Sequence, residues 1–207
     1  MKIINCYYLK SEESFAIILE YLEGGDLRKY INEKGRLEEQ ECQELFKQLF
    51  EAINFCHRNK VIHRDLKLEN LMFLNEEKKD LRVVDFGIAG SDSKINNEQT
   101  NAGSIRYLTP EVITYRYPAH PGIDIWAMGV ILFWMLSGRP PFDGNTRQEV
   151  QDKILKADFN FDKAMRKSTS KSVRNLISSM LTINIKARID MKQIYDHPWM
   201  KYSVHGL

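Results

Sequence analysis

The chain has 207 residues, of which 43% are hydrophobic and 28% are charged, and its formal net charge is +2. This length suits one well-buried domain, and so small a net charge excludes the strongly basic surface of a typical nucleic-acid-binding protein. The three cysteines are too few and too scattered for a disulfide framework, and they form no C-x-x-C zinc site. We therefore expect an intracellular, cytoplasmic protein with no nucleic-acid partner.

The first elements along the chain are predicted to be two strands and a short helix. Residues 3–9 and 15–21 are rich in Ile, Phe and Tyr and flank a polar turn, which is typical of paired strands. Asp26 is a suitable N-cap for a helix that runs through Asn32, and Gly35 ends it.

A long amphipathic helix follows, and after it short apolar runs alternate with polar loops. Residues 61–73 and 81–84 are strand-like runs on either side of one such loop. Residues 88–109 hold few large apolar groups and indicate a long flexible loop, of the kind that is usually functional or disordered. The helix spans residues 37–57, and its apolar stripe consists of Cys42, Leu45, Phe46, Leu49, Phe50, Ile53 and Cys56.

After Glu111 the chain is predicted to be helical, so the whole reads as α+β, with strands first and helices after them. The segment Ile123–Leu136 is apolar on all sides, but it is shorter than the roughly 18–20 residues that a bilayer needs, and it contains Asp124. We expect a buried core helix here rather than a membrane span. Further helices are predicted at Arg147–Lys156, Ser172–Leu181 and Met191–Asp196.

Residues 63–87 contain side chains suited to phosphoryl transfer. This reaction needs metal ions on the phosphate oxygens, a group that orients the acceptor hydroxyl, and a positive charge that balances the transition state. In the segment HRDLKLEN, Asp65 is placed to orient the hydroxyl or accept its proton, and Lys67 to neutralise the transferring phosphoryl group. Asn70 and Asp85 offer the oxygen ligands that Mg²⁺ prefers.

The string HRDLKLEN at residues 63–70 and the tripeptide Asp85-Phe86-Gly87 resemble two signatures of the eukaryotic protein kinase family. An exposed polar turn would explain one Asp or Lys alone, but not both strings at this spacing. The resemblance runs over residues 1–200 and implies a protein kinase that uses ATP and Mg²⁺. It also implies a kinase-like α+β fold, with a mostly helical large lobe and only a remnant of the small β lobe.

Other positions resemble the serine/threonine kinases of the calcium/calmodulin-dependent and AMP-activated group. Lys67 gives the loop its serine/threonine form, and Ser104 stands where such kinases place a hydroxyl that bonds to the catalytic Asp and Lys. The tripeptide His197-Pro198-Trp199 resembles the closing motif of many members of this group. The resemblance therefore implies protein substrates with serine or threonine acceptors.

Three further positions are assigned structural roles by the same resemblance. Asp124 corresponds to the buried aspartate that holds the backbone of the catalytic loop. Glu111 and Arg188 correspond to a conserved ion pair of the family, which we expect to be largely buried. Loss of either partner should then cost stability rather than chemistry.

The nucleotide site is implied by the segment Leu19-Glu20-Tyr21-Leu22, which resembles the kinase hinge. Backbone groups of Glu20 and Leu22 would bind adenine, with Leu19 as the gatekeeper and Met72 as the apolar floor beneath the base. Without the resemblance, these residues read only as the end of a buried strand.

Substrate and regulatory residues follow from the resemblance as well. Glu69 and Asp26 stand where a basic residue of the substrate is often received, although each could equally be a solvated carboxylate. Thr100 aligns with the activation-loop threonine that an upstream kinase phosphorylates, and Arg64 would pair with its phosphate. The alternative for Thr100 is an ordinary threonine in a disordered loop.

The sequence departs from the family at its start, because no G-x-G-x-x-G loop and no V-A-I-K strand are present. We therefore expect a kinase domain that lacks the amino-terminal part of its small lobe, with a remnant at 1–19, the hinge at 20–25, the large lobe at 26–200 and a tail at 201–207. Two functions remain open: a serine/threonine protein kinase, or a catalytically inactive kinase-like module that binds partners.

Overall fold

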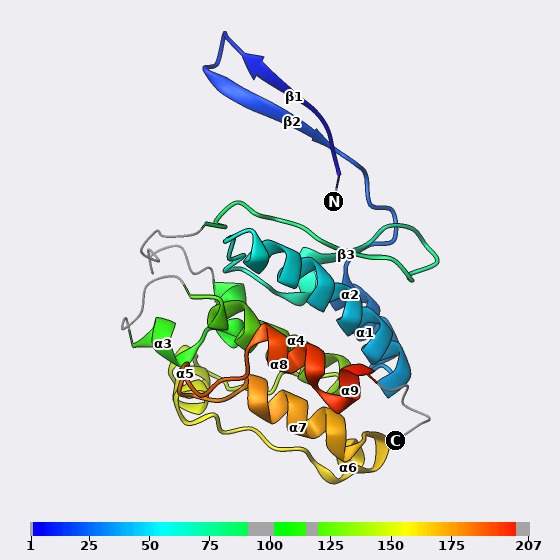
Figure 1. Ribbon diagram of the computed structural model, residues 1–207, viewed down its shortest axis with the longest axis vertical. Coiled ribbons are helices and arrows are strands. Elements are labelled where there is room, and N and C mark those ends of the chain that lie inside the picture. Colours follow the sequence, from blue (N-terminus) through cyan, green and yellow to red (C-terminus); the bar gives the residue numbers. More distant parts are fainter. Residues whose placement is uncertain (1, 91–101, 115–119, 202–207) are drawn as a thin grey trace.

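The computed structural model describes residues 2–90, 102–114 and 120–201. A two-stranded ribbon projects from a mostly helical body, as Figure 1 shows. A second small antiparallel sheet lies within that body. This architecture confirms the predicted α+β fold, with a helical large lobe and a small β remnant.

The projecting ribbon consists of strands β1 (Ile3–Leu9) and β2 (Ser14–Leu19), which pair antiparallel. Both strands were predicted, although β2 begins one residue earlier and ends two residues earlier than expected. Every residue of β1 is exposed, so the ribbon contributes nothing to the core. Its side chains contact one another instead, and the rings of Tyr8 and Phe15 lie 5.1 Å apart.

Helices α1 (Leu27–Lys34) and α2 (Glu39–Arg58) confirm the next two predictions. The Asp26 carboxylate accepts a hydrogen bond from the Lys29 N–H at 2.8 Å and so caps α1, as the sequence indicated. Gly35 ends α1 with a φ of 81°, a conformation that glycine adopts without strain. The predicted stripe of α2 is buried at Cys42, Leu45, Phe46, Leu49, Phe50 and Ile53.

The predicted strand-like run at residues 61–73 is only partly a strand. Residues Leu71–Phe73 form β3, which pairs antiparallel with β4 (Leu81–Val83), while Leu68–Asn70 form the short 3₁₀ helix η1. Residues 61–67 contain no strand, because two backbone N–H groups there donate to the side chain of Asp124 rather than to a neighbouring strand. The strand prediction for residues 61–67 is therefore wrong.

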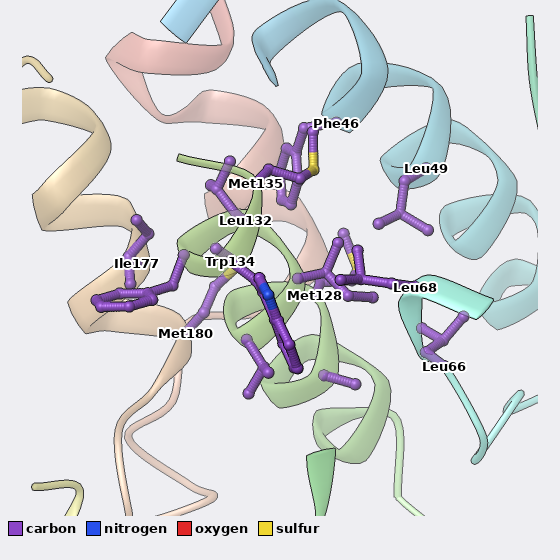
Figure 2. Close-up of a cluster of buried hydrophobic side chains, with 14 of the residues drawn as sticks. Phe46, Leu49, Leu66, Leu68, Met128, Leu132, Trp134, Met135, Ile177 and Met180 are labelled. Carbon is purple, nitrogen blue, oxygen red and sulfur yellow. The ribbon is translucent and has the colours of Figure 1, made fainter. Parts of the chain in front are cut away.

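The centre of the body is helix α4 (Gly122–Ser137), in which every residue from Gly122 to Leu136 is buried. Side chains of α2 and of α7 (Lys171–Met180) converge on α4 from different sides, as Figure 2 shows. The prediction of a buried core helix is therefore confirmed. Within the described part of the chain, no helix is long and apolar enough to cross a membrane.

The remaining helices surround this core, and some of them were not predicted. Residues 102–107 form the 3₁₀ helix η3, so the predicted flexible loop at 88–109 is wrong there, and residues 91–101 lie outside the described part. Helices α3, α6 and α9 have only four to six residues and were not predicted as separate helices. The set comprises α3 (Pro110–Ile113), α5 (Arg147–Lys156), α6 (Lys163–Ser168), α8 (Met191–Asp196) and α9 (Pro198–Lys201).

Gly138 at the end of α4 gives a testable consequence of this packing. Its φ is +75°, and a Cβ atom added there would lie 2.0 Å from the carbonyl oxygen of Gly35. We expect Gly138→Ala to lower the free energy of unfolding by about 1–3 kcal/mol or more, from backbone strain and from this clash. Gly25→Ala is the matched control, because Gly25 has a φ of +74° but no atom within 4 Å of the added Cβ. Equal losses in chemical denaturation would contradict the clash.

Candidate active site

The loop at residues 63–70 is held by the carboxylate of Asp124, which projects from the buried helix α4. Asp124 Oδ2 accepts a hydrogen bond from the His63 N–H at 2.9 Å, and Oδ1 accepts one from the Arg64 N–H at 2.9 Å. His57 Nε2 lies 2.8 Å from the same Oδ2. Arg64 has a φ of +69°, which is unfavourable for a residue with a side chain. The bonds to Asp124 offset this cost and fix the direction of the loop.

Three of the predicted catalytic side chains meet within this loop. Lys67 Nζ lies 2.5 Å from Asp65 Oδ2, and Asn70 Nδ2 donates to the Asp65 carbonyl oxygen at 2.9 Å and to Oδ2 at 3.3 Å. The side chains of Asp65 and Lys67 are 21% and 20% exposed, so an incoming substrate can reach them. The loop thus presents a carboxylate, an ammonium group and an amide oxygen at one place.

The fourth predicted residue, Asp85, is brought to the loop by the strand that precedes it. The Val84 N–H donates to the Asn70 carbonyl at 2.9 Å, and His63 Nε2 lies 3.0 Å from the Val84 carbonyl. Asp85 follows directly, exposed and with a φ of +63°, and its Oδ1 accepts from the Gly87 N–H at 3.3 Å. These contacts of Val84 place the backbone of Asp85 next to the loop at residues 63–70.

Asn70 and Asp85 together suit a hard divalent cation. Asn70 donates both of its side-chain hydrogen bonds from Nδ2, which leaves Oδ1 as the acceptor that a cation requires. Mg²⁺ is commonly held by one or two protein oxygens, with waters and substrate phosphates completing the shell. Among the described residues, no cluster of three or more His, Cys, Asp or Glu could hold a metal ion. Asn70 and Asp85 supply the one or two protein oxygens of such a shell.

The predicted nucleotide-binding residues are divided between the ribbon and the body. Leu19 ends β2, and the Glu20 N–H donates to the Lys2 carbonyl at 3.0 Å, which ties Glu20 to the ribbon. Leu22 is buried, and the residues that follow it lie along β3, which contains Met72. The Glu23 and Gly24 N–H groups donate to the carbonyls of Leu74 and Phe73 at 3.1 and 3.2 Å.

The two predicted substrate carboxylates differ in what they already bind. The Asp26 carboxylate caps α1. Glu69 is exposed, and its Oε2 accepts a hydrogen bond from the Tyr107 hydroxyl at 3.5 Å. That hydroxyl also accepts from the Leu68 N–H at 3.3 Å, and burial together with the nearby Glu69 charge raises the pKa of Tyr107 well above its usual value. Glu69 is thus the carboxylate that a substrate can reach more readily.

The predicted regulatory residues are described only in part. Thr100 lies outside the described residues, and so does the side chain of Ser104, which belongs to η3. Arg64 is partly exposed, and its backbone N–H is held by Asp124.

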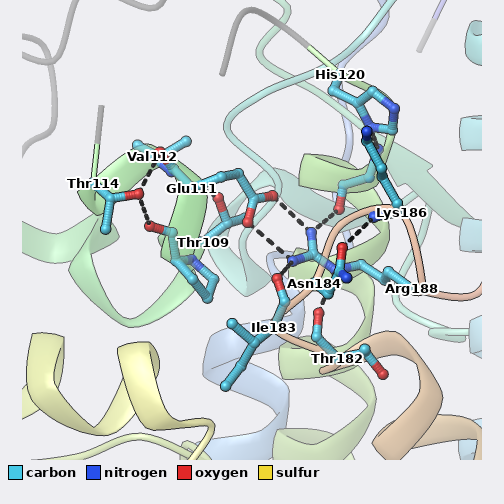
Figure 3. Close-up of polar contacts among 12 residues, drawn as sticks. Thr109, Glu111, Val112, Thr114, His120, Thr182, Ile183, Asn184, Lys186 and Arg188 are labelled. Atoms are coloured by element: carbon cyan, nitrogen blue, oxygen red, sulfur yellow. Dashed lines mark hydrogen bonds and ion pairs between the residues drawn. The ribbon is translucent and has the colours of Figure 1, made fainter. Parts of the chain in front are cut away.

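Glu111 and Arg188 form a buried, bidentate ion pair, shown in Figure 3. The Arg188 Nη1 and Nη2 atoms donate to the two Glu111 carboxylate oxygens at 2.7 and 3.0 Å. The guanidinium also donates to three backbone carbonyls and lies 4.9 Å from the centre of the Trp126 ring. The side chains of Glu111 and Arg188 are only 4% and 1% exposed, so this buried pair links α3 to the loop before α8.

Two residues of the site were not identified from the sequence. His57 contacts the anchoring Asp124, and Tyr107 contacts the backbone of η1 and the Glu69 side chain. The sequence could have indicated Tyr107, because it is a large aromatic residue in the polar segment GSIRYLTPE. His57 lies on α2, 67 residues before its partner Asp124, and nothing in the sequence around it indicated this contact.

The Asp124 anchor can be tested with Asp124→Asn. An asparagine has one acceptor oxygen, so its –NH₂ group would face one of the backbone N–H groups that now donate to Asp124. We expect the free energy of unfolding to fall by about 2–3 kcal/mol, because a buried donor is left unsatisfied. The exposed Asp158→Asn is the matched control and should change stability by less than about 0.5 kcal/mol. Equal urea midpoints for the two variants would contradict the role of Asp124.

Comparisons with known proteins agree with this geometry. Residues 1–200 match the family model described as "Protein kinase domain". The chain is 34% identical over 201 residues to "Calcium-dependent protein kinase 5" of Plasmodium falciparum (isolate 3D7), covering 96% of this chain and 35% of the relative. It is 38% identical over 185 residues to "Carbon catabolite-derepressing protein kinase" of Secale cereale, covering 89% of this chain and 36% of the relative.

A third relative is "Calcium and calcium/calmodulin-dependent serine/threonine-protein kinase" of Lilium longiflorum, 36% identical over 185 residues, covering 89% of this chain and 35% of the relative. The chain spans about a third of the length of these curated relatives. The family model and the relatives confirm the resemblance drawn from HRDLKLEN and the DFG tripeptide. With 1–200 of its 207 residues covered, the chain belongs to the protein kinase domain family.

Proposed function

We propose that this chain carries the phosphoryl-transfer site of a serine/threonine protein kinase, which moves the γ-phosphate of ATP to hydroxyl groups of protein substrates. The observation that supports it most is the convergence of Asp65, Lys67 and Asn70 in one loop, with Asp85 tied beside them through Val84. The serine/threonine kinases among its relatives support the same reaction class.

Each of these side chains has a distinct role in the proposed reaction. Asp65 orients the acceptor hydroxyl and accepts its proton as the bond to phosphorus forms. Lys67 places a positive charge where negative charge develops on the transferring phosphoryl group. Asn70 and Asp85 hold Mg²⁺, which neutralises the phosphate oxygens of ATP when it is bound.

Substrate choice, regulation and location extend this proposal. Glu69 favours substrates with a basic residue near the acceptor, and its exposed carboxylate supports this. Phosphorylation of Thr100 by an upstream kinase orders the activation segment through Arg64. A reducing, cytoplasmic location is supported by three free cysteines, of which Cys42 is buried.

The direct test is transfer of labelled phosphate from γ-labelled ATP to a generic basic protein. We expect transfer with Mg²⁺ present and its loss when EDTA removes the metal, and we expect Asp85→Asn to raise the Mg²⁺ concentration required for half-maximal transfer. If neither Mg²⁺ nor Asp85→Asn alters the label found in the substrate, the proposed function is wrong. The chain would then be a kinase-like binding module, the other function that the sequence left open.

A further inference from the structure

The guanidinium of Arg28, in the first turn of α1, lies over the indole ring of Trp134. Its guanidinium carbon is 4.1 Å from the ring centroid, and Trp134 is buried within α4. The opposite charge needed for an ion pair is missing: within residues 2–90, 102–114 and 120–201, no carboxylate lies within ion-pairing distance of this guanidinium. A partly exposed arginine is thus fixed in position by stacking rather than by a salt bridge.

Stacking leaves the hydrogen-bonding capacity of an arginine intact. The contact with an aromatic ring uses the flat face of the guanidinium, whereas its N–H groups point outward in the plane. A stacked arginine therefore offers a preorganised fork of donors that matches a carboxylate or a phosphate group. The side chain loses little further rotamer freedom when such a group binds.

The position of Arg28 places this fork beside the proposed substrate site. Helix α1 packs against η1, which carries Glu69. Trp134 also stacks on Tyr107, with the ring centroids 5.9 Å apart, and the Tyr107 hydroxyl donates to Glu69. The pKa of Tyr107 responds to both charges, since Glu69 raises it and Arg28 lowers it. One cation and one anion therefore border the same stretch of surface.

We infer that Arg28 is a specificity-determining residue, which selects protein substrates that carry an acidic or phosphorylated side chain close to the acceptor hydroxyl. This inference rests on the proposed function, because it names the substrate class of the same site. Glu69 and Arg28 together would favour a substrate in which a basic and an acidic residue lie near the acceptor. The charge of Arg28 is held in place, so its effect should depend on the position of the acidic residue in the substrate.

The test measures binding of fluorescent peptides to the full chain by anisotropy, separately from phosphate transfer. Each peptide contains one serine, and a glutamate or a phosphoserine replaces a glutamine at each neighbouring position in turn. We expect the acidic peptide to bind about tenfold more tightly than its glutamine counterpart at one or two positions. In Arg28→Gln the acidic peptide and its glutamine counterpart should bind equally well. Arg28→Glu should instead bind a peptide with lysine at the same position more tightly than the glutamine peptide.

Lys29→Ala is the matched control, because it removes the same charge from the adjacent residue of α1, about a quarter-turn around the helix. This variant should keep the ratio. An unchanged ratio in Arg28→Gln, or no acidic preference by the wild-type chain at any position, would overturn the inference. The inference would also be overturned if Arg28→Gln bound lysine peptides more tightly but bound acidic peptides as the wild-type chain does. Arg28 would then act only by weakening the attraction of Glu69 for basic residues. Failure of the proposed function appears separately, as peptides that bind but receive no phosphate.

Discussion

Replacing Arg188 with alanine is expected to lower the free energy of unfolding by about 3–5 kcal/mol. The change leaves the Glu111 carboxylate buried without the two hydrogen bonds that satisfy its oxygens. It also removes the donors to the carbonyls of Thr182 and Gly122. Since domains of this kind are stable by only about 5–15 kcal/mol, the variant should lose a large part of its stability. Urea unfolding followed by circular dichroism measures the loss.

Two controls distinguish the loss of the Glu111–Arg188 ion pair from the general effect of removing an arginine side chain. Arg58→Ala removes an exposed arginine from the last turn of α2 and should cost less than about 1 kcal/mol. The double variant Glu111→Leu with Arg188→Met replaces both charges by apolar groups and should cost less than the sum of the single variants. A small loss in Arg188→Ala, comparable to that of Arg58→Ala, would show that the pair contributes little.

The features that could be predicted from the sequence are those that depend on residues close together in the chain. The α2 stripe repeats over a long segment, and the Asp26 cap and the Gly35 end are fixed by neighbouring residues. The residues to which we assign chemical roles in the loop at 63–70 lie within one short, continuous sequence segment. Each of these features was therefore visible before any tertiary contact was known.

Features that depend on distant contacts could not be predicted. The apolar residues of the run 61–73 indicated a strand, yet the backbone N–H groups of His63 and Arg64 donate to Asp124, about sixty residues further along the chain. Arg28 lies over Trp134 across a still longer gap in sequence, and neither residue alone indicates a partner. Such contacts follow from the packing of α1 and α4 around the catalytic loop, and no local pattern encodes that packing.

Asp65→Asn is expected to slow phosphate transfer by about 10²–10⁴-fold while leaving the fold intact. Asparagine has nearly the same shape as aspartate but cannot accept the proton of the acceptor hydroxyl. It also removes the ion pair with Lys67, whose side chain is partly exposed, so stability should change by less than about 1 kcal/mol. The rate is measured under saturating ATP and Mg²⁺, with the basic substrate used to test the proposed function.

The control for this variant is Asp80→Asn, which removes an exposed carboxylate near β4 and should leave the rate unchanged. Because Asp65 acts on the transferred group rather than on nucleotide binding, its loss should lower the turnover rate with little change in the ATP concentration that gives half-maximal rate. A turnover rate for Asp65→Asn close to that of Asp80→Asn would remove Asp65 from the proposed mechanism. A raised requirement for ATP with unchanged turnover would instead assign the residue to nucleotide binding.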